Sequence, residues 1–129
     1  MNKKERQAYY RLNAEKIKKQ KREWRKKNPI LCREIDIRRR RKLRMGALLA
    51  YSNGKLECAC CSEKLFEFLS LDHINGGGSK ERLLRGRGND FYQYLRNNKY
   101  PPGLQVLCMN CNFAKGKFGG CPHKRHGKT

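Results

Sequence analysis

Two Cys-x-x-Cys pairs constrain the fold of this chain more than any other feature. Cys58 and Cys61 form the first pair, Cys108 and Cys111 form the second, and 46 residues separate the pairs. Thiolates at this spacing on tight turns reach one tetrahedral ion, and zinc is the usual ion for four sulfur ligands. Such a closed site has no open coordination position. We therefore expect a structural zinc ion that staples two strands of a domain too small for a self-sufficient core.

Three further cysteines receive no ligand role from this pattern. The sequence CACC also permits a Cys-x-Cys pairing through Cys60, but Cys-x-x-Cys is the commoner arrangement, so Cys60 is left out of the site. Cys32 is most simply an unpaired thiol on a helix. Cys121 and His123, in CPH, could form half of a second metal site, but only His126 is left over to complete it. We therefore expect no second ion.

The charge of the chain predicts a polyanionic partner. Lys and Arg number 32 against 11 Asp and Glu in 129 residues, which gives a net charge of +21. No apolar run approaches the roughly 18 residues of a membrane-spanning helix, and no amphipathic stretch has a strong apolar face. We therefore expect nucleic acid, not a membrane, as the partner. The N-terminus lacks the apolar segment of a secretory signal, so we expect a reducing, cytoplasmic compartment, in which cysteines bind metals in preference to forming disulfides.

The first 46 residues are expected to form a basic helical arm that binds DNA. Residues 1–45 hold 19 of the 32 basic residues against five acids and show almost no apolar periodicity, so this segment cannot build a core. Good helix formers, no glycine before Gly46 and a break at Pro29 predict two helices, at about 3–27 and 30–50.

A weak repeat runs through this arm. YYRLNAEKIKK and WRKKNPILCRE align at a period of about 15 residues and match Tyr9 with Trp24 and Asn13 with Asn28. The alternatives are an arm that follows phosphates and a duplicated, partly disordered basic tail; we favour the arm. Its candidate nucleic-acid ligands are Lys18, Arg22, Arg25, Arg39 and Arg40.

A compact domain is expected over residues 47–129, where apolar residues, paired cysteines and turn glycines appear together. FEFLSLDHI predicts a strand of six or seven residues because its side chains alternate from Phe66 onward. We expect the rest to be a glycine-rich loop over 75–90, a short helix from Asp90 to 98, a second strand over 104–108, a short helix from 110 that stops near Gly116, and an irregular tail over 119–129.

Asp72 and His73 stand side by side where the first predicted strand runs into the glycines of LDHINGGG. Asn112 directly follows Cys111, so a zinc staple would bring Asn112 towards them. Carboxylate and amide oxygens suit a magnesium-like ion that keeps waters and takes phosphate oxygens, and a neutral imidazole can serve as a general base. Strict alternation would point Asp72 and His73 to opposite faces, so the strand must bend or end there.

The succession of Cys-x-x-Cys, LDHINGGG, FYQYLRNNKYPPGLQVLCMNCNFAKG and CPH, from Cys58 to His123, resembles the zinc-containing HNH endonucleases of phages and mobile introns. The basic arm is similar to the N-terminal extension of some of these homing-type nucleases. The resemblance implies an α+β chain in which the arm, residues 1–46, precedes a small ββα-metal (HNH, His-Me finger) domain over 47–129 that is stapled by the four-cysteine zinc site.

The resemblance also implies roles for four residues. Asp72 and Asn112 would bind one catalytic Mg²⁺ or Mn²⁺ ion, His73 would activate water, and Lys115 would lie near the phosphate backbone. These roles would accompany the structural zinc ion.

One departure from the family pattern concerns the middle asparagine, which steadies the loop between the strands. It usually lies just before the second strand, where this chain has Pro102, Gly103 and Leu104. Its role is lost here or passed to Gln105 or Asn98.

The chain is therefore expected to be a metal-dependent endonuclease that hydrolyses a phosphodiester bond in double-stranded DNA. One active centre favours nicking by a monomer, and no coiled-coil heptads indicate a dimer. Arg82, Arg85 and Arg87 in the glycine-rich loop would contact the groove or line the backbone. A restriction or packaging nuclease is a related alternative. The alternative from another class is a non-catalytic zinc-ribbon protein that binds DNA or structured RNA. Under this alternative, the positions of Asp72, His73 and Asn112 would be a coincidence.

Overall fold

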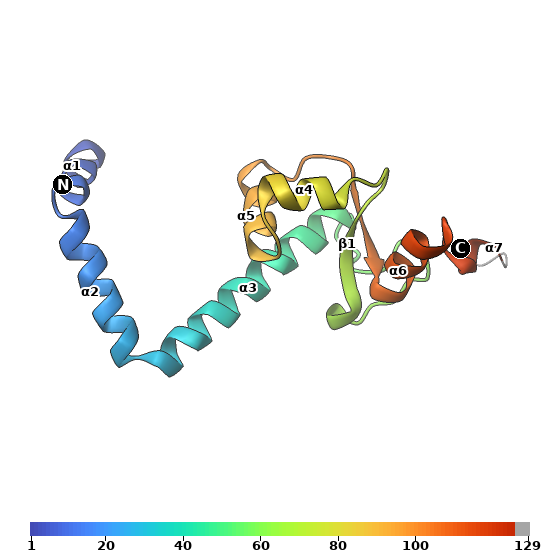
Figure 1. Ribbon diagram of the computed structural model, residues 1–129, viewed down its shortest axis with the longest axis horizontal. Coiled ribbons are helices and arrows are strands. Elements are labelled where there is room, and N and C mark those ends of the chain that lie inside the picture. Colours follow the sequence, from blue (N-terminus) through green and yellow to red (C-terminus); the bar gives the residue numbers. More distant parts are fainter. Residues whose placement is uncertain (126–129) are drawn as a thin grey trace. The chain divides into compact units, whose positions relative to one another are not determined.

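The computed structural model describes residues 1–125, and within them it shows an α+β chain of seven α-helices, one 3-10 helix and a two-stranded antiparallel sheet (Figure 1). The elements in chain order are α1 (Lys3–Leu12), α2 (Ala14–Lys27), α3 (Pro29–Tyr51), the 3-10 helix η1 (Phe66–Phe68), β1 (Leu69–His73), α4 (Gly78–Arg85), α5 (Asn89–Asn97), β2 (Leu104–Cys108), α6 (Met109–Phe118) and α7 (Pro122–Arg125). The predicted α+β class is confirmed. The chain divides into unit 1 (Met1–Arg39) and unit 2 (Arg40–Thr129).

The repeat in unit 1 marks two equivalent helix ends. α1 ends at Asn13, whose side-chain amide donates to the carbonyl of Tyr9 at 2.9 Å. α2 ends at Asn28, whose amide donates to the carbonyl of Trp24 at 2.8 Å. An asparagine at the helix C-cap thus binds a carbonyl of the last turn. The prediction of one helix over 3–27 is corrected, because the first copy of this cap interrupts it at Asn13.

Unit 1 is held together by local contacts. Among the described side chains of α1 and α2 none is buried. At the junction of α2 and α3, Arg25 Nη2 lies 3.0 Å from Asp36 Oδ2, and the buried Cys32 thiol lies 4.0 Å from the carbonyl of Arg25. Among the described residues of unit 1, Cys32 is the buried apolar side chain.

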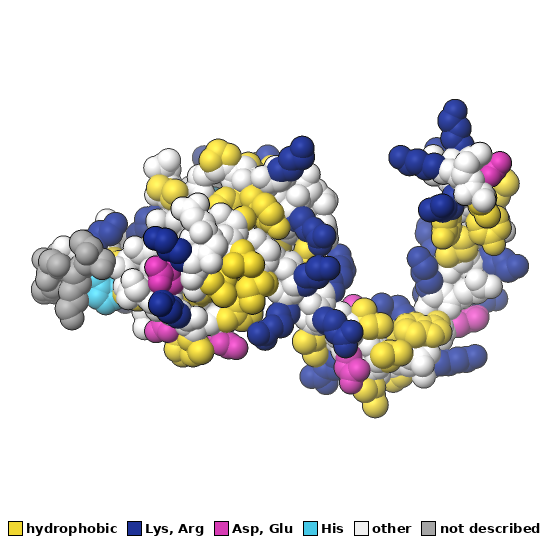
Figure 2. Space-filling model, turned by 180° about the vertical axis from the view of Figure 1, so that it is seen from behind, with side chains coloured by type: hydrophobic (Ala, Val, Ile, Leu, Met, Phe, Trp, Pro, Cys, Tyr) yellow, Lys and Arg dark blue, Asp and Glu magenta, His cyan; other side chains and the backbone are white. Residues whose placement is uncertain are grey.

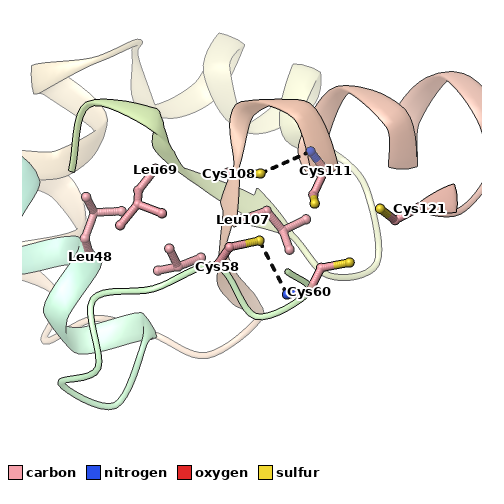
Figure 3. Packing of buried hydrophobic residues seen from close by; sticks show 9 residues of the cluster. Leu48, Cys58, Cys60, Leu69, Leu107, Cys108, Cys111 and Cys121 are labelled. Atoms are coloured by element: carbon pink, nitrogen blue, oxygen red, sulfur yellow. Dashed lines mark hydrogen bonds between the residues drawn. The ribbon is translucent and has the colours of Figure 1, made fainter. Parts of the chain in front are cut away.

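Unit 2 is built around the two strands. β1 pairs antiparallel with β2, with Leu69 opposite Cys108 and His73 opposite Leu104. Leu69 is fully buried, and it belongs to one cluster with Leu48 of α3 and most of the cysteines (Figure 3). α6 contacts both strands. The strand-to-helix turn at Cys108 is thereby placed against the core.

The predicted strand from Phe66 is corrected, because Phe66–Phe68 forms a 3-10 turn and β1 begins at Leu69. Arg44 of α3 explains this turn. Its guanidinium donates to the carbonyls of Phe66 at 3.0 Å and Leu69 at 2.6 Å, and it lies 4.5 Å from the centre of the Phe66 ring. Successive carbonyls of an extended strand point in opposite directions. One guanidinium can therefore bind the carbonyls of both Phe66 and Leu69 only where the chain turns.

The glycine-rich segment over 75–90 is not a plain loop as predicted, because it contains α4. Its glycines lie at the helix ends: Gly77 before α4 has a φ of 90° and Gly86 after it has a φ of 87°. Glycine adopts these values without steric cost. The residues between them are mainly good helix formers, so the glycines bound a helix and do not replace it. α5 and β2 lie where the sequence predicts them.

Two predictions near the C-terminus are also corrected. α6 passes through Gly116 and ends at Phe118, where Gly119 takes a left-handed φ of 72° as the C-cap. The predicted irregular tail contains α7, which begins at Pro122, a residue favoured at the first helical position.

The compact units divide within α3, at Arg39 and Arg40, whereas the composition of the sequence changes at Ala47. Leu43 is buried and Arg44 binds the start of β1, so this part of α3 belongs to unit 2. No helix within residues 1–125 combines the length and apolar character needed to cross a bilayer.

Candidate functional site

The four cysteines of the two pairs meet in unit 2. The sulfur atoms of Cys58, Cys61, Cys108 and Cys111 lie within 4.8 Å of one another, and those of Cys61 and Cys108 are 3.7 Å apart. Two sulfur ligands of a tetrahedral zinc ion lie about 3.8 Å apart, given Zn–S bonds of about 2.3 Å. Cys108 ends β2 and caps α6, so the strand-to-helix turn carries the second pair. This group can hold a metal ion such as zinc, as the spacing predicts.

Backbone N–H groups point at the sulfur atoms of this group. The N–H groups of Cys60 and Cys111 donate to Cys58 Sγ at 3.4 Å and to Cys108 Sγ at 3.5 Å (Figure 3). That of Cys61 also donates to Cys58 Sγ, at 3.5 Å. Burial opposes ionisation of Cys58, but the backbone donors outweigh it and lower the pKa of this thiol. Burial raises the pKa of Cys61 to about 11. Cys58 is therefore the thiol of this pair that is readier to become a thiolate, the form that binds metals.

A second group of ligand atoms adjoins the first. The Sγ atoms of Cys60, Cys111 and Cys121 and a ring nitrogen of His123 lie within 4.8 Å of one another. The sequence predicted no second ion, because only His126, which lies outside the described residues, remained as a partner for Cys121 and His123. This prediction is corrected, because Cys60 and Cys111 lie close enough to complete a second ligand group. CACC and CPH carried the signal in the sequence. Only the tertiary fold, however, brings these distant segments to the same end of α6.

Asp72, the residue before the end of β1, has a buried carboxylate. Asp72 Oδ2 accepts hydrogen bonds from Lys115 Nζ at 2.6 Å and from Gln105 Nε2 at 2.9 Å. Lys115 Nζ also donates to the carbonyls of His73 at 2.9 Å and Ile74 at 3.0 Å. Both bonds to the carboxylate converge on Oδ2, which leaves Oδ1 for another partner. Lys115 was expected near the phosphate backbone, and the structure places its ammonium on Asp72 and the strand end.

His73 is the last residue of β1, and its ring packs against the segment that joins the strands. Its ring stacks on Phe91 of α5, with 5.8 Å between centroids and an interplanar angle of 27°. A Cβ atom on Gly78 would lie 3.1 Å from Nδ1, so a larger residue at the start of α4 would require the ring to shift by a few tenths of an ångström. Nε2 is buried and has no hydrogen-bond partner within residues 1–125. Such atoms are rare in native structures, and a catalytic role is one of their explanations.

Asn112 of α6 lies beside the same strand. Its Nδ2 donates to Ser70 Oγ at 3.0 Å and to the carbonyl of Leu71 at 3.3 Å, which leaves Oδ1 available. A pocket of about 460 Å³ is lined by Asp72, His73 and Asn112 together. Asp72 and His73 share it because β1 ends at His73. A carboxylate and an amide oxygen facing one pocket fit a magnesium-like ion by their chemistry.

The three arginines of the segment between the strands differ in position. Arg82 lines the 460 Å³ pocket and a neighbouring cavity of about 240 Å³, and Arg87 lines the latter. Arg85 instead lies 4.3 Å from the centre of the Tyr94 ring and 3.7 Å from a carboxylate oxygen of Glu81. Two of the three predicted arginines therefore reach the pockets around His73.

The predicted ligands in the basic helices are exposed. Lys18 lies 3.6 Å from a carboxylate oxygen of Glu15, and Arg25 is paired with Asp36. The remaining members of this set are Arg22 and Arg39 in unit 1 and Arg40, the first residue of unit 2. Figure 2 shows Lys and Arg side chains along unit 1 on the face displayed, with apolar side chains between them.

Ser70, Gly78 and Phe91 belong to the site but are not predicted from the sequence. Ser70 gave a weak signal, since it precedes Asp72 by two residues on a strand and therefore shares its side of the sheet. The sequence gave no signal for Gly78 and Phe91, because their contact with His73 depends on how α4 and α5 pack together.

The two candidates for the role of the middle asparagine are separated by the structure. Gln105 faces Asp72 across the sheet and binds its carboxylate. The side chain of Asn98 caps α5 by donating to the carbonyl of Tyr94 at 2.9 Å. Gln105 is therefore the one that contacts the strand-end residues.

Comparison with protein-family models, with curated proteins and with solved structures found no match to this chain. Its function must therefore be inferred from the site itself.

Proposed function

We propose that unit 2 is a divalent-metal-dependent endonuclease of the HNH type that hydrolyses a phosphodiester bond in double-stranded DNA. One observation carries the proposal: within the described part of the chain, Asp72, His73 and Asn112 line one pocket. Two antiparallel strands and a helix that contacts both support a ββα-metal fold for this unit. The resemblance of the Cys-x-x-Cys pairs and of LDHINGGG in this chain to those of HNH endonucleases also supports the proposal.

In this proposal His73 is the general base. Phe91 holds the ring by stacking, and Gly78 leaves room beside Nδ1 on the side of the pocket. Nδ1 accepts a proton from a water molecule, the water oxygen attacks the phosphorus, the bond from phosphorus to the leaving oxygen breaks, and the leaving alkoxide takes a proton from solvent water. A positioned general base of this kind contributes about 100-fold or more to a rate.

Asp72 Oδ1 and Asn112 Oδ1 would hold the magnesium or manganese ion. When bound, such an ion stabilises the negative charge that develops on the phosphate and on the leaving oxygen. Lys115 and Gln105 fix the Asp72 carboxylate through Oδ2, and Ser70 fixes the Asn112 amide. Both ligands are therefore oriented by neighbouring hydrogen bonds, as in well-ordered metal sites.

DNA affinity would come from the positive charge. Arg82 and Arg87 line the cavities beside His73 and are placed to meet phosphate oxygens next to the reacting one. The basic helices would supply most of the nonspecific affinity, because neutralising phosphates releases counterions from the duplex. The residues that line the two cavities around His73 all belong to unit 2. The proposed role of unit 1 is therefore to bind DNA and not to take part in the reaction.

A non-catalytic protein that binds DNA or structured RNA is the second candidate. The ion pair between Lys115 and Asp72 favours it, because an ammonium at 2.6 Å already neutralises the carboxylate that would hold the catalytic ion. This candidate explains the charge and the cysteine groups. It gives no reason for the convergence of Asp72, His73 and Asn112 on one pocket, and we therefore prefer the nuclease.

Incubation of the zinc-loaded protein with supercoiled plasmid distinguishes the two. The nuclease should convert the plasmid to relaxed circles when magnesium is added and leave it supercoiled without magnesium. A protein that retards the plasmid on a gel at every magnesium or manganese concentration and never relaxes it would refute the proposal.

A further inference from the structure

Cys111 belongs to two ligand groups at once. It completes the group of Cys58, Cys61 and Cys108, and it also completes the group of Cys60, Cys121 and His123. The two groups together comprise six cysteines and one histidine. In Figure 3 the sulfur atoms of Cys111, Cys60 and Cys121 lie close together at one end of α6.

The distances in the second group fit a metal site. His123 Nδ1 lies 3.2 Å from Cys121 Sγ, 3.4 Å from Cys111 Sγ and 3.7 Å from Cys60 Sγ. A nitrogen and a sulfur ligand of one tetrahedral zinc ion lie about 3.6 Å apart, given Zn–N and Zn–S bonds of about 2.1 and 2.3 Å. His123 therefore faces three sulfur atoms at the spacing that a shared ion would impose.

We propose that the chain binds two zinc ions in a binuclear cluster whose bridging ligand is the Cys111 thiolate. Each zinc ion takes four ligands in a structural site. The seven ligand atoms fill two tetrahedra only if one of them serves both ions, and Cys111 is the member common to both groups. The first ion is held by Cys58, Cys61, Cys108 and Cys111, and the second by Cys60, Cys111, Cys121 and His123.

A single ion would leave Cys60 and Cys121 as buried sulfur atoms beside His123 without a cation. Both thiols are buried, at 5% and 7% exposure. A second ion supplies two positive charges to the two thiolates added by these residues, so the outer half of the cluster adds no net charge. Soft thiolates with one imidazole form a typical zinc ligand set.

The cluster would join three distant segments at the start of α6. The turn at Cys60, the first turn of α6 at Cys111 and the C-terminal segment at Cys121 would share the bridged pair of ions. Asn112 directly follows the bridging residue. The cluster therefore fixes the helix turn that presents Asn112, and this inference holds whether or not unit 2 cleaves DNA.

The zinc content of the full chain tests the number of ions. Elemental analysis of the purified, zinc-loaded protein should give two equivalents per chain. Cys121→Ser and His123→Ala should each retain one, since the group formed by the two Cys-x-x-Cys pairs stays complete. Cys32→Ser is the matched control, because Cys32 is also a buried cysteine but belongs to neither group, and it should keep two. One equivalent in the wild type, or two in His123→Ala, would overturn the proposal.

Substitution with ¹¹³Cd tests the bridge in the unaltered protein, so the result does not depend on the folding of a variant. A proton–cadmium correlation spectrum should show the β protons of one cysteine, Cys111, coupled to two cadmium resonances, and those of five other cysteines coupled to one each. Two cadmium resonances without any shared cysteine, or a single resonance, would show that Cys111 does not bridge.

Discussion

Asp72 and Asn112 each use part of the side chain for support and leave one oxygen free. Asp72 gives Oδ2 to Lys115 and Gln105, and Asn112 gives its amide hydrogens to Ser70 Oγ and a strand carbonyl. In the proposed function, the two free oxygens would form a weak, water-rich site, because magnesium keeps several waters when few protein ligands are offered. The metal requirement of the proposed reaction should therefore depend on single residues.

Asn112→Ala should raise the magnesium concentration needed for half-maximal nicking, since it removes one of the two proposed protein oxygens. Asn112→Asp should be less impaired, because it restores an oxygen ligand although it loses both hydrogen bonds to β1. Nicking rates measured against magnesium concentration check this. Asn110→Ala, an exposed position on the same helix, is the control. An unchanged magnesium dependence in Asn112→Ala would place the ion elsewhere.

Gly78 controls the space beside the His73 ring. Gly78→Ala would put a Cβ atom 3.1 Å from Nδ1, so the ring must move by a few tenths of an ångström. Because misplacement of reacting groups by about 1 Å can cost roughly 100-fold, we expect nicking to fall about 10-fold. Gly116→Ala is the control, since it also lines the pocket but its Cβ would meet no atom within 4 Å. Equal rates in both variants would argue against Nδ1 as the proton acceptor.

At the scale of secondary-structure elements, the turn from β2 into α6 carries several functions at once. Cys108 ends the strand, caps the helix by accepting from the backbone N–H of Cys111, and belongs to the first cysteine group. The pairing of β1 with β2 and the position of Asn112 both depend on this turn. A metal ion held there would stabilise the sheet and the pocket together.

Cys108→Ser separates these roles, because serine is itself a good helix N-cap. The variant should keep the cap but lose a metal ligand, and most of the free energy of a structural zinc site is folding free energy of several kcal/mol. We expect less than the wild-type zinc content and loss of a cooperative thermal transition. Calorimetry with parallel zinc analysis measures both, and Cys32→Ser should behave as wild type. A Cys108→Ser protein with unchanged transition and zinc content would contradict the assignment of Cys108 as a ligand.

Elements bounded by strong local signals could be predicted from the sequence. β2 was predicted because Pro101, Pro102 and Gly103 end the preceding structure and apolar residues follow. α4 was missed because its flanking glycines indicate a loop, although here they bound a helix. The 3-10 turn before β1 depends on Arg44, which lies far away in sequence and leaves no local pattern.

The same distinction applies to the candidate site. The first cysteine group follows from spacing within two short segments, and Asp72 and His73 follow from their adjacency. The second cysteine group could not be predicted, because Cys60 meets Cys121 and His123 only after α6 has folded. The contact of Phe91 with His73 likewise depends on how α4 and α5 pack together and was missed.

At the scale of the whole molecule, unit 1 carries much of the positive charge but no part of the pocket. Residues 1–39 hold 15 of the 32 basic residues, and the pocket is lined by residues of unit 2. The separation between binding and chemistry should therefore be visible in experiments on DNA.

Deletion of residues 1–39 tests this separation. The deletion spares Leu43 and Arg44, which belong to unit 2. The slope of log affinity against log salt is about 0.9 per phosphate neutralised on duplex DNA, so the truncated protein should show a shallower slope. Nicking at saturating protein and low salt should persist. A salt slope equal to that of the full chain would show that unit 1 does not contact phosphates.

The initial nicking rate of His73→Ala on supercoiled plasmid, at saturating magnesium, tests the central claim most directly. Zinc content and plasmid affinity are measured on the same sample as controls. Loss of a general base should lower the rate by about 100-fold or more while zinc content and affinity stay those of the wild type. A His73→Ala protein that nicks at the wild-type rate would contradict the claim that His73 activates water.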